Sequence, residues 1–215
     1  MNIKSLIAEC IGTFALIFIG AGALAIGHAD LLGVALAHAF VVIGFIYAYG
    51  HLSGTHINPA VTLAFLVAGE IRLGTAIGYW TVQLLGALFG AFLLKVLLPT
   101  PGDLGVTILS PDVTPLQGML VETLLTFLLV NTIFNTAVSG KAGGFAGLAI
   151  GVTLVFCILM GGPLTRAGLN PARTLGPAIV SGTYTDLWLY LVGPCVGAIL
   201  AALLYVGVLK ENGRV

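Results

Sequence analysis

The sequence predicts an all-α integral membrane protein with six transmembrane helices and two re-entrant half-helices, arranged as an inverted repeat of three spans plus three spans. Three observations support this fold class. Only 7% of the 215 residues are charged and 59% are hydrophobic, whereas a soluble domain carries about 25% charged residues. Six apolar segments are long enough to cross a bilayer. The tripeptide Asn-Pro-Ala occurs twice, once in each half of the chain.

The composition also excludes several functions. The net charge is 0, so a basic surface for nucleic acid is not expected. The three cysteines, Cys10, Cys157 and Cys195, are scattered through apolar segments and indicate neither a disulfide framework nor a metal site. A catalytic pair of nucleophile and base is not apparent. We therefore expect that the chain is not an enzyme and that it has no metal, no cofactor and no nucleic-acid partner.

The six expected spans follow from length and apolarity alone. A transmembrane helix needs roughly 20 mostly apolar residues. The segments that qualify are 5–27, 33–50, 74–98, 115–139, 144–162 and 185–209. The first continues well beyond Glu9, so we interpret it as a spanning helix and not as a cleaved signal. We expect one domain over residues 1–215, with repeat halves at about 1–100 and 113–215.

Two shorter apolar segments, 59–68 and 171–180, are interpreted as half-helices. Asparagine is a favoured N-cap and proline is favoured at the first helical position, so each tripeptide predicts an abrupt helix start. Ten residues of helix extend about 15 Å, which is about half of a hydrocarbon core near 30 Å thick. Two such helices that enter from opposite faces would meet near the midplane. The two starts are Asn58-Pro59-Ala60 and Asn170-Pro171-Ala172.

An internal repeat supports entry from opposite faces. Glu9 precedes Asn58 by 49 positions, and Glu122 precedes Asn170 by 48 positions. Each half contains three spans and one half-helix. Because three is an odd number, the second half must be inverted relative to the first.

The charged loops predict the orientation. Positive charge marks the cytoplasmic side of a membrane protein, so we expect both termini in the cytoplasm and a multi-pass protein of the plasma membrane. The basic residues on one predicted face are Lys4, Arg72, Lys141, Lys210 and Arg214, and the acidic residues on the other are Asp30, Asp103, Asp112 and Asp186, with Lys95 near that side.

Two facing helix N-termini would control what crosses the midplane. They carry partial positive charge, and barriers of this kind exclude cations and protons. The amides of Asn58 and Asn170 would donate hydrogen bonds to a water between them. Each asparagine could instead be only a helix cap, but two copies in an inverted repeat favour a lining of a water-filled passage.

Four further polar residues in apolar segments allow two interpretations each. Arg173 either faces the passage or reaches the membrane surface, and we favour the passage because an arginine rarely faces lipid. Glu9 and Glu122 either form a proton or ion site, or act as braces that accept hydrogen bonds from the re-entrant loops; we favour braces. His38 either faces the passage or lies in the core, and we favour the passage.

The sequence resembles the aquaporin, or major intrinsic protein, family over nearly its whole length. The segments that carry the resemblance are AECIGTF (8–14), GHLSGTHINPAVT (50–62) and LNPARTLGPA (169–178). The resemblance implies an aquaporin-like channel domain with six helices around two half-helices, a homotetramer with one pore per subunit, and passive flow of water or small neutral solutes without a cofactor.

The resemblance also implies a selectivity filter. Counted from the asparagines, the four filter positions of the family fall on His38, Ile158, Ala167 and Arg173. This set is most similar to the plant tonoplast branch. Ile158 makes the filter more apolar and less selective, so ammonia is expected to pass as well as water. Arg166 departs from the family pattern, and we expect it to reach the outer vestibule or to pair with an aspartate such as Asp112.

We therefore predict a passive channel in the lipid bilayer for water and for ammonia or other small neutral solutes, which excludes protons and ions. Two alternatives remain open. One is a facilitator for glycerol or small polyols. The other is a coupled secondary transporter, since inverted repeats and broken helices occur there too, although such a protein usually needs an ion-coordinating site at the midplane.

Overall fold

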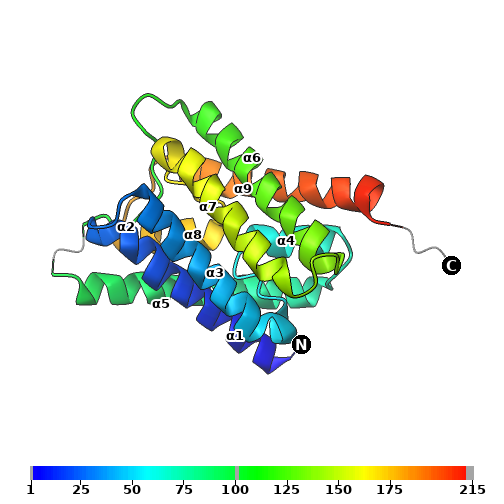
Figure 1. Ribbon diagram of the computed structural model, residues 1–215. Helices are drawn as coiled ribbons and strands as arrows, with labels where there is room; N and C mark the ends of the chain where they lie inside the picture. Colours follow the sequence, from blue (N-terminus) through cyan, green and yellow to red (C-terminus); the bar gives the residue numbers. More distant parts are fainter. Residues whose placement is uncertain (1, 100–101, 212–215) are drawn as a thin grey trace.

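Six long helical segments and two short helices form the protein in a computed structural model that describes residues 2–99 and 102–211 (Figure 1). Each long segment is apolar and long enough to cross a membrane. The model therefore confirms the predicted all-α membrane fold. The long segments are Ile3–Ile26, Leu31–Ser53, Leu73–Leu97, Pro115–Val138, Gly143–Thr165 and Leu187–Leu209.

Three of the spans change their helical geometry along their length. The first consists of α1 (Ile3–Ala15), a π-helical segment and α2 (Gly22–Ile26). The fourth is α6 (Pro115–Ile133) with a π-helical end, and the sixth is α9 (Leu187–Leu204) with another. The π-helical segments are Leu16–Ala21, Phe134–Val138 and Tyr205–Leu209. The remaining spans are α3 (Leu31–Ser53), α5 (Leu73–Leu97) and α7 (Ala146–Thr165), the last preceded by a short 3-10 turn, Gly143–Phe145.

The second span is longer than its predicted range of 33–50. The Asp30 carboxylate accepts a hydrogen bond from the backbone N–H of Gly33, at 2.7 Å, and so caps the helix before Leu31. At the other end Gly54, with φ of 82°, ends the helix. These local capping contacts, which an apolarity count does not register, set the ends of α3.

The two half-helices begin at the predicted prolines. They are α4 (Pro59–Val67) and α8 (Pro171–Ser181). Both lie inside the ring of long helices, and Figure 1 shows them toward opposite ends of the bundle. Gly182, with φ of 79°, ends α8 one residue beyond the predicted limit.

Close packing of glycine against backbone joins the long helices of each half. A Cβ atom on Gly86 of α5 would lie 2.3 Å from the Cys10 carbonyl oxygen of α1, and one on Gly197 of α9 would lie 2.1 Å from the Thr123 carbonyl oxygen of α6. Small residues at such crossings let helix backbones approach closely in lipid. The α1–α5 and α6–α9 interfaces are therefore equivalent helix crossings in the two repeat halves.

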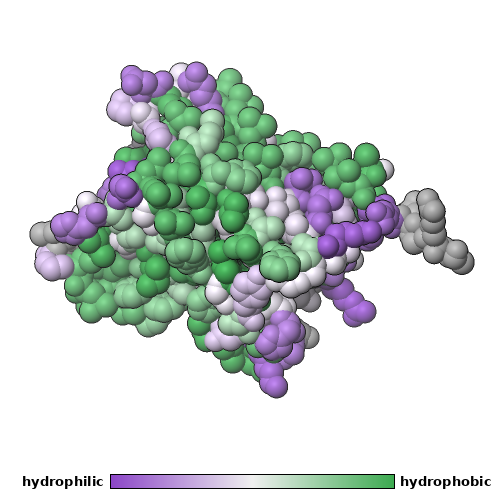
Figure 2. Space-filling view, viewed as in Figure 1, coloured by the Kyte–Doolittle hydropathy of each residue, from purple (hydrophilic) through white to green (hydrophobic). Residues whose placement is uncertain are grey.

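The surface fits a membrane protein. Figure 2 shows hydrophobic side chains over most of the middle of the visible face, whereas hydrophilic ones gather toward the ends of the helices. Ion pairs from Lys210 to Glu70 and from Lys141 to Glu211, each at 2.9 Å, join segments at the end of the bundle where α1 begins. Arg214, assigned to this face from the sequence, lies outside the described residues.

Candidate functional site

The two Asn-Pro-Ala segments meet head to head in the interior. The Asn58 Nδ2 donates a hydrogen bond to the Leu169 carbonyl oxygen, and the Asn170 Nδ2 donates one to the Ile57 carbonyl oxygen, both at 2.9 Å. Each amide therefore links its own half-helix to the loop of the opposite repeat. A carboxamide has two N–H donors, so one donor per asparagine remains for a molecule beside this junction.

The same asparagines cap the helices that they begin. The Asn58 side-chain oxygen accepts from the Ala60 N–H at 2.8 Å, and the Asn170 side-chain oxygen accepts from the Ala172 N–H at 2.9 Å. Both caps satisfy helix N–H groups that have no partner within the helix. In each asparagine the side-chain oxygen forms the helix cap and the side-chain nitrogen forms the cross-link. The role as a helix cap therefore leaves the amide nitrogen available for other contacts.

Both re-entrant loops have unusual backbone geometry at matching positions. The φ angles are positive at Thr55 and Ile57 in the first loop, and at Ala167 and Leu169 in the second. Positive φ is strained for a residue with a side chain and most of all for a β-branched one such as Ile57. The surrounding hydrogen bonds must hold this geometry in place.

Two buried glutamates provide those hydrogen bonds. Glu9 accepts from the backbone N–H groups of His56 and Ile57, at 2.8 and 2.6 Å. Glu122 accepts from those of Gly168 and Leu169, at 2.8 and 2.7 Å. Both carboxyl groups are 0% exposed, and the other donors that reach them belong to Ser53, Gln83 and Thr165.

One narrow cavity runs along this junction. Its volume is about 90 Å³, which is room for several waters in an enclosed site. It reaches from His38 and Arg173 at one end, past both asparagines, to Phe65 and Ala137 at the other. Neither Glu9 nor Glu122 is among the described residues that line it. The predicted filter residues Ile158 and Ala167 also lie on its wall, and so do Val61 and Ile150.

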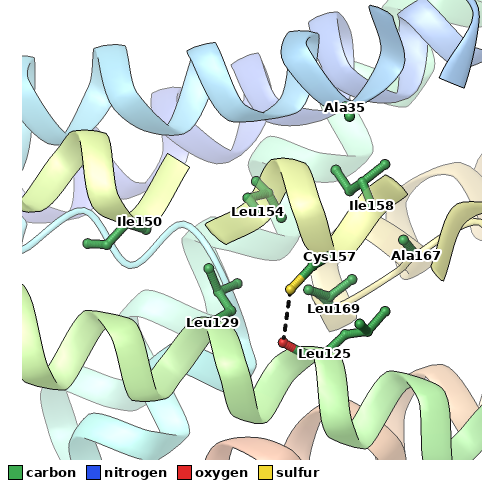
Figure 3. Close-up of a cluster of buried hydrophobic side chains, with 9 residues drawn as sticks. All are labelled: Ala35, Leu125, Leu129, Ile150, Leu154, Cys157, Ile158, Ala167 and Leu169. Atoms are coloured by element: carbon green, nitrogen blue, oxygen red, sulfur yellow. Dashed lines mark hydrogen bonds between the residues drawn. The ribbon is translucent and has the colours of Figure 1, made fainter. Parts of the chain in front are cut away.

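Part of the wall is an apolar stripe on α7. Ile150, Leu154 and Ile158 recur every four residues and so share one face of the helix. Figure 3 shows this stripe beside Leu125 and Leu129 of α6. Cys157 points elsewhere: its Sγ lies 3.6 Å from the Leu125 carbonyl oxygen. The middle of the passage therefore offers few polar atoms besides those of the re-entrant loops.

The polar atoms concentrate at the end of the cavity where His38 and Arg173 lie. The Arg173 Nη1 donates to the Gly105 carbonyl oxygen at 2.6 Å, while its Nε and Nη2 have no protein partner among the described residues. The His38 Nδ1 lies 2.9 Å from the Val34 carbonyl oxygen. Because a carbonyl only accepts, Nδ1 carries a proton, and in a neutral ring Nε2 is then an acceptor. Two residues of the same cavity lining thus carry donors and an acceptor without a protein partner among the described residues.

Arg166 does not pair with Asp112. Its guanidinium forms an ion pair with Asp103 and donates to the Val106 carbonyl oxygen at 3.1 Å. Asp103 is within reach because the turn that begins at residue 102 folds back over the end of α7, and Asp103 accepts within that turn from the Gly105 N–H at 2.9 Å. Of the two outcomes expected for Arg166, the structure shows the pairing with an outer aspartate, which is Asp103 and not the example named from the sequence, Asp112.

Several contacts of the site were not predicted from the sequence. Gln83 of α5 donates to both Glu9 and Thr62, at 2.9 and 3.0 Å, and the Trp80 Nε1 donates to the Pro59 carbonyl oxygen at 3.0 Å. A glutamine inside an otherwise apolar span is itself a signal of a buried polar contact. Among residues 2–99 and 102–211, no cluster of three or more potential metal ligands occurs.

The fold and the site define a helical membrane channel with one narrow passage. The chain matches the major intrinsic protein family over residues 1–205, and it belongs to that family. Members of this family are passive channels for water or small solutes and not enzymes. The chain is therefore a multi-pass integral membrane protein of this channel family.

Relatives come from several branches of the family. The lens fiber major intrinsic protein of Gallus gallus is 43% identical over 210 residues, which cover 94% of this chain and 80% of that protein. Aquaporin NIP1-1 of Zea mays is 39% identical and covers 94% of this chain and 74% of its own length. The probable aquaporin TIP3-2 of Arabidopsis thaliana is 38% identical, with 95% and 83% covered.

A solved structure shares the fold. The aquaglyceroporin from Plasmodium falciparum superposes with a TM-score of 0.83 at 26% sequence identity, and the match covers 97% of each chain. This agreement over the full length includes the six spans and both half-helices of the described chain.

Proposed function

We propose that this chain is a passive channel for water that also admits ammonia or other small neutral solutes and excludes protons and ions. The observation that carries the proposal is a cavity whose lining includes two cross-linked asparagines at facing helix N-termini and also Arg173. Two helix N-termini and a guanidinium place positive potential on the path, which repels cations. The asparagine amides offer hydrogen bonds to an uncharged solute without offering it a charge.

We assign the selectivity filter to His38, Ile158, Ala167 and Arg173. All four line the same cavity, and the two polar ones have atoms without a protein partner. Ile158 contributes only hydrocarbon to this ring. Hydrocarbon cannot replace the hydrogen bonds that a solute loses when it leaves bulk water, so a weakly hydrated solute such as ammonia is penalised less there than a strongly hydrated one.

We assign Glu9 and Glu122 a structural role. Each accepts two consecutive backbone N–H groups of its own re-entrant loop, and neither lines the cavity. This arrangement favours braces over a proton relay. It also weighs against a coupled transporter, which usually needs an ionisable or ion-coordinating group exposed to its path.

The assembly and location follow from the family and from charge. We propose one channel domain per chain, a homotetramer, and insertion in the plasma membrane with both termini in the cytoplasm. The orientation rests on the basic residues near the end of the bundle where α1 begins.

Stopped-flow light scattering on proteoliposomes tests the substrate. Water, ammonia and glycerol are measured in parallel, and proton leak is followed with an enclosed pH-sensitive dye. We expect fast water flux, measurable ammonia flux, slow glycerol flux and no proton leak above that of empty vesicles. Fast proton leak would contradict the proposal.

A glycerol facilitator is the second candidate, because the structural neighbour described above is an aquaglyceroporin. Glycerol flux that exceeds water flux in the same vesicles would favour it. Solute uptake that depends on an imposed proton gradient would instead favour a coupled transporter.

A further inference from the structure

The turn at residues 102–107 contacts both arginines at one mouth of the cavity. Arg166 reaches it twice, through the Asp103 carboxylate and through the Val106 carbonyl oxygen. Arg173 reaches it through the Gly105 carbonyl oxygen. The two arginines therefore hold the same short turn from two sides.

The Asp103 carboxylate joins these contacts into a chain. One of its oxygens pairs with Arg166, and the other accepts the Gly105 N–H at 2.9 Å. The carbonyl of that same Gly105 accepts from the Arg173 Nη1 at 2.6 Å. The position of the Arg173 acceptor thus depends on a carboxylate that Arg166 holds by a charge-assisted hydrogen bond.

The turn is seated against the rest of the protein. A Cβ atom on Gly105, whose φ is 69°, would lie 2.3 Å from the Ala21 carbonyl oxygen. The side chains of Leu104 and Val106 are 1% and 2% exposed. The Thr107 hydroxyl lies 3.1 Å from that of Thr174, next to Arg173. Packing therefore holds the inner side of the turn, and the Arg166–Asp103 pair holds its more exposed side.

We propose that Arg166 is a positioning residue for Arg173, acting through Asp103 and the turn at 102–107, and that the pair sharpens the discrimination between water and larger neutral solutes. This inference rests on the proposed function. With Nη1 held by Gly105, the guanidinium of Arg173 keeps its place on the cavity wall, and its Nε and Nη2 have no protein partner among the described residues. Loss of the pair releases the turn, widens the range of Arg173 positions and lets larger solutes pass.

The test compares glycerol and water permeability in the same proteoliposomes. Arg166→Asn removes the guanidinium, and asparagine tolerates the positive φ of 58° at this position. Asp103→Asn removes the negative charge of the other partner in the ion pair. We expect each variant to raise the ratio of glycerol to water permeability about threefold to tenfold, a range typical of coupled contacts. Arg166→Lys keeps the charge but not the forked geometry, so its ratio should lie in between.

The double variant tests whether the two residues act as one unit. Arg166→Asn combined with Asp103→Asn should change the ratio no more than either single variant does, because the same link is already lost. Lys210→Gln is the matched control: it breaks an ion pair of similar exposure at the opposite end of the bundle, and its ratio should equal that of the unaltered protein.

Each outcome has one meaning. Ratios that stay within experimental error of the unaltered protein in both single variants, or effects that add fully in the double variant, would overturn the inference and leave the proposed function intact. An unaltered protein that does not pass water overturns the proposed function itself. If Arg166→Asn fails to fold, Asp103→Asn decides, because it breaks the same pair without changing the end of α7.

Discussion

The two re-entrant arms, one around Asn58 and one around Asn170, share a scaffold but differ in what they present to the passage. In each arm a buried glutamate holds two backbone N–H groups, and an asparagine crosses to the opposite loop. Three residues after the asparagine, however, the first arm has Val61 and the second has Arg173, and both line the cavity. The repeated residues therefore build the passage, and under the proposed function the unrepeated ones set its selectivity.

The arms also share a contact at the start of each loop. The Tyr79 hydroxyl donates to the Ser53 carbonyl oxygen, and the Tyr190 hydroxyl donates to the Thr165 carbonyl oxygen, both at 2.9 Å. Each tyrosine lies seven residues before the glycine of the close helix crossing in its own half, Gly86 or Gly197, so the two occupy equivalent positions. The carbonyl at the start of each loop needs a donor in an apolar surrounding, and the same residue type supplies it in both arms.

The largest expected effect comes from removing a shared element. Glu122→Leu leaves the Gly168 and Leu169 N–H groups without their acceptor, and each buried donor without a partner costs about 1–3 kcal/mol. We expect a destabilisation of about 3 kcal/mol or more, seen as a lower Tm of the detergent-solubilised protein. Glu9→Leu should act in the same direction. If only one of the two lowered the Tm, the arms would not share a scaffold.

The next effect separates the arms. Arg173→Val makes the second arm resemble the first and removes the guanidinium from the passage. Proton leak into proteoliposomes should rise by about tenfold or more, the change that roughly 1.4 kcal/mol of lost barrier produces. Val61→Ala, at the equivalent position of the first arm, should leave the proton leak at the level of the unaltered protein. Equal proton leaks in the two variants would contradict the proposed difference between the two arms.

A smaller effect tests the other side of the filter. A Cβ atom on Gly20 would lie 2.6 Å from the His38 ring, so Gly20→Ala should push that ring toward the passage. Water flux should fall by about twofold to threefold, because overpacking of this kind displaces side chains. Gly44→Ala on α3 is the control, since a Cβ there meets no atom within 4 Å. An unchanged flux in Gly20→Ala would show that the ring turns away instead.

The smallest effect is expected far from both arms. The Glu70 carboxylate beside Lys210 raises the pKa of that lysine above its ordinary value. Any stability from this pair is therefore present below pH ~10 and is lost as pH rises through the folded-state pKa. Because the lysine is exposed and the pair is open to solvent, Lys210→Gln should leave the Tm at pH 7 unchanged. A clear drop in Tm would show that this end of the bundle matters for stability.

Much of the fold was predictable because apolar length and helix-start chemistry are local properties. The six spans and the starts at Pro59 and Pro171 follow from them. The spacing of Glu9 and Glu122 before the two asparagines also placed the acids beside the correct loops. The exact ends of α3 were not predictable from apolarity, because the Asp30 cap and the turn at Gly54 decide them.

The details of the site were harder to predict because they depend on contacts between distant segments. The positive φ of Ile57 runs against the preference of a β-branched residue, and only the surrounding hydrogen bonds hold it. The choice of Asp103 over Asp112 depends on how an irregular loop folds, and such a loop has no periodic pattern. The four proposed filter residues were predicted through family resemblance, and their common cavity is a property of the three-dimensional arrangement.

The crossed asparagine contacts also constrain how the chain is made. Asn58 bonds to a residue 111 positions later, and Asn170 bonds to one 113 positions earlier. During synthesis the first half reaches the bilayer while its partner carbonyl does not yet exist, so the first arm cannot settle until the second has been inserted. These two crossed bonds therefore form only after both halves have entered the bilayer.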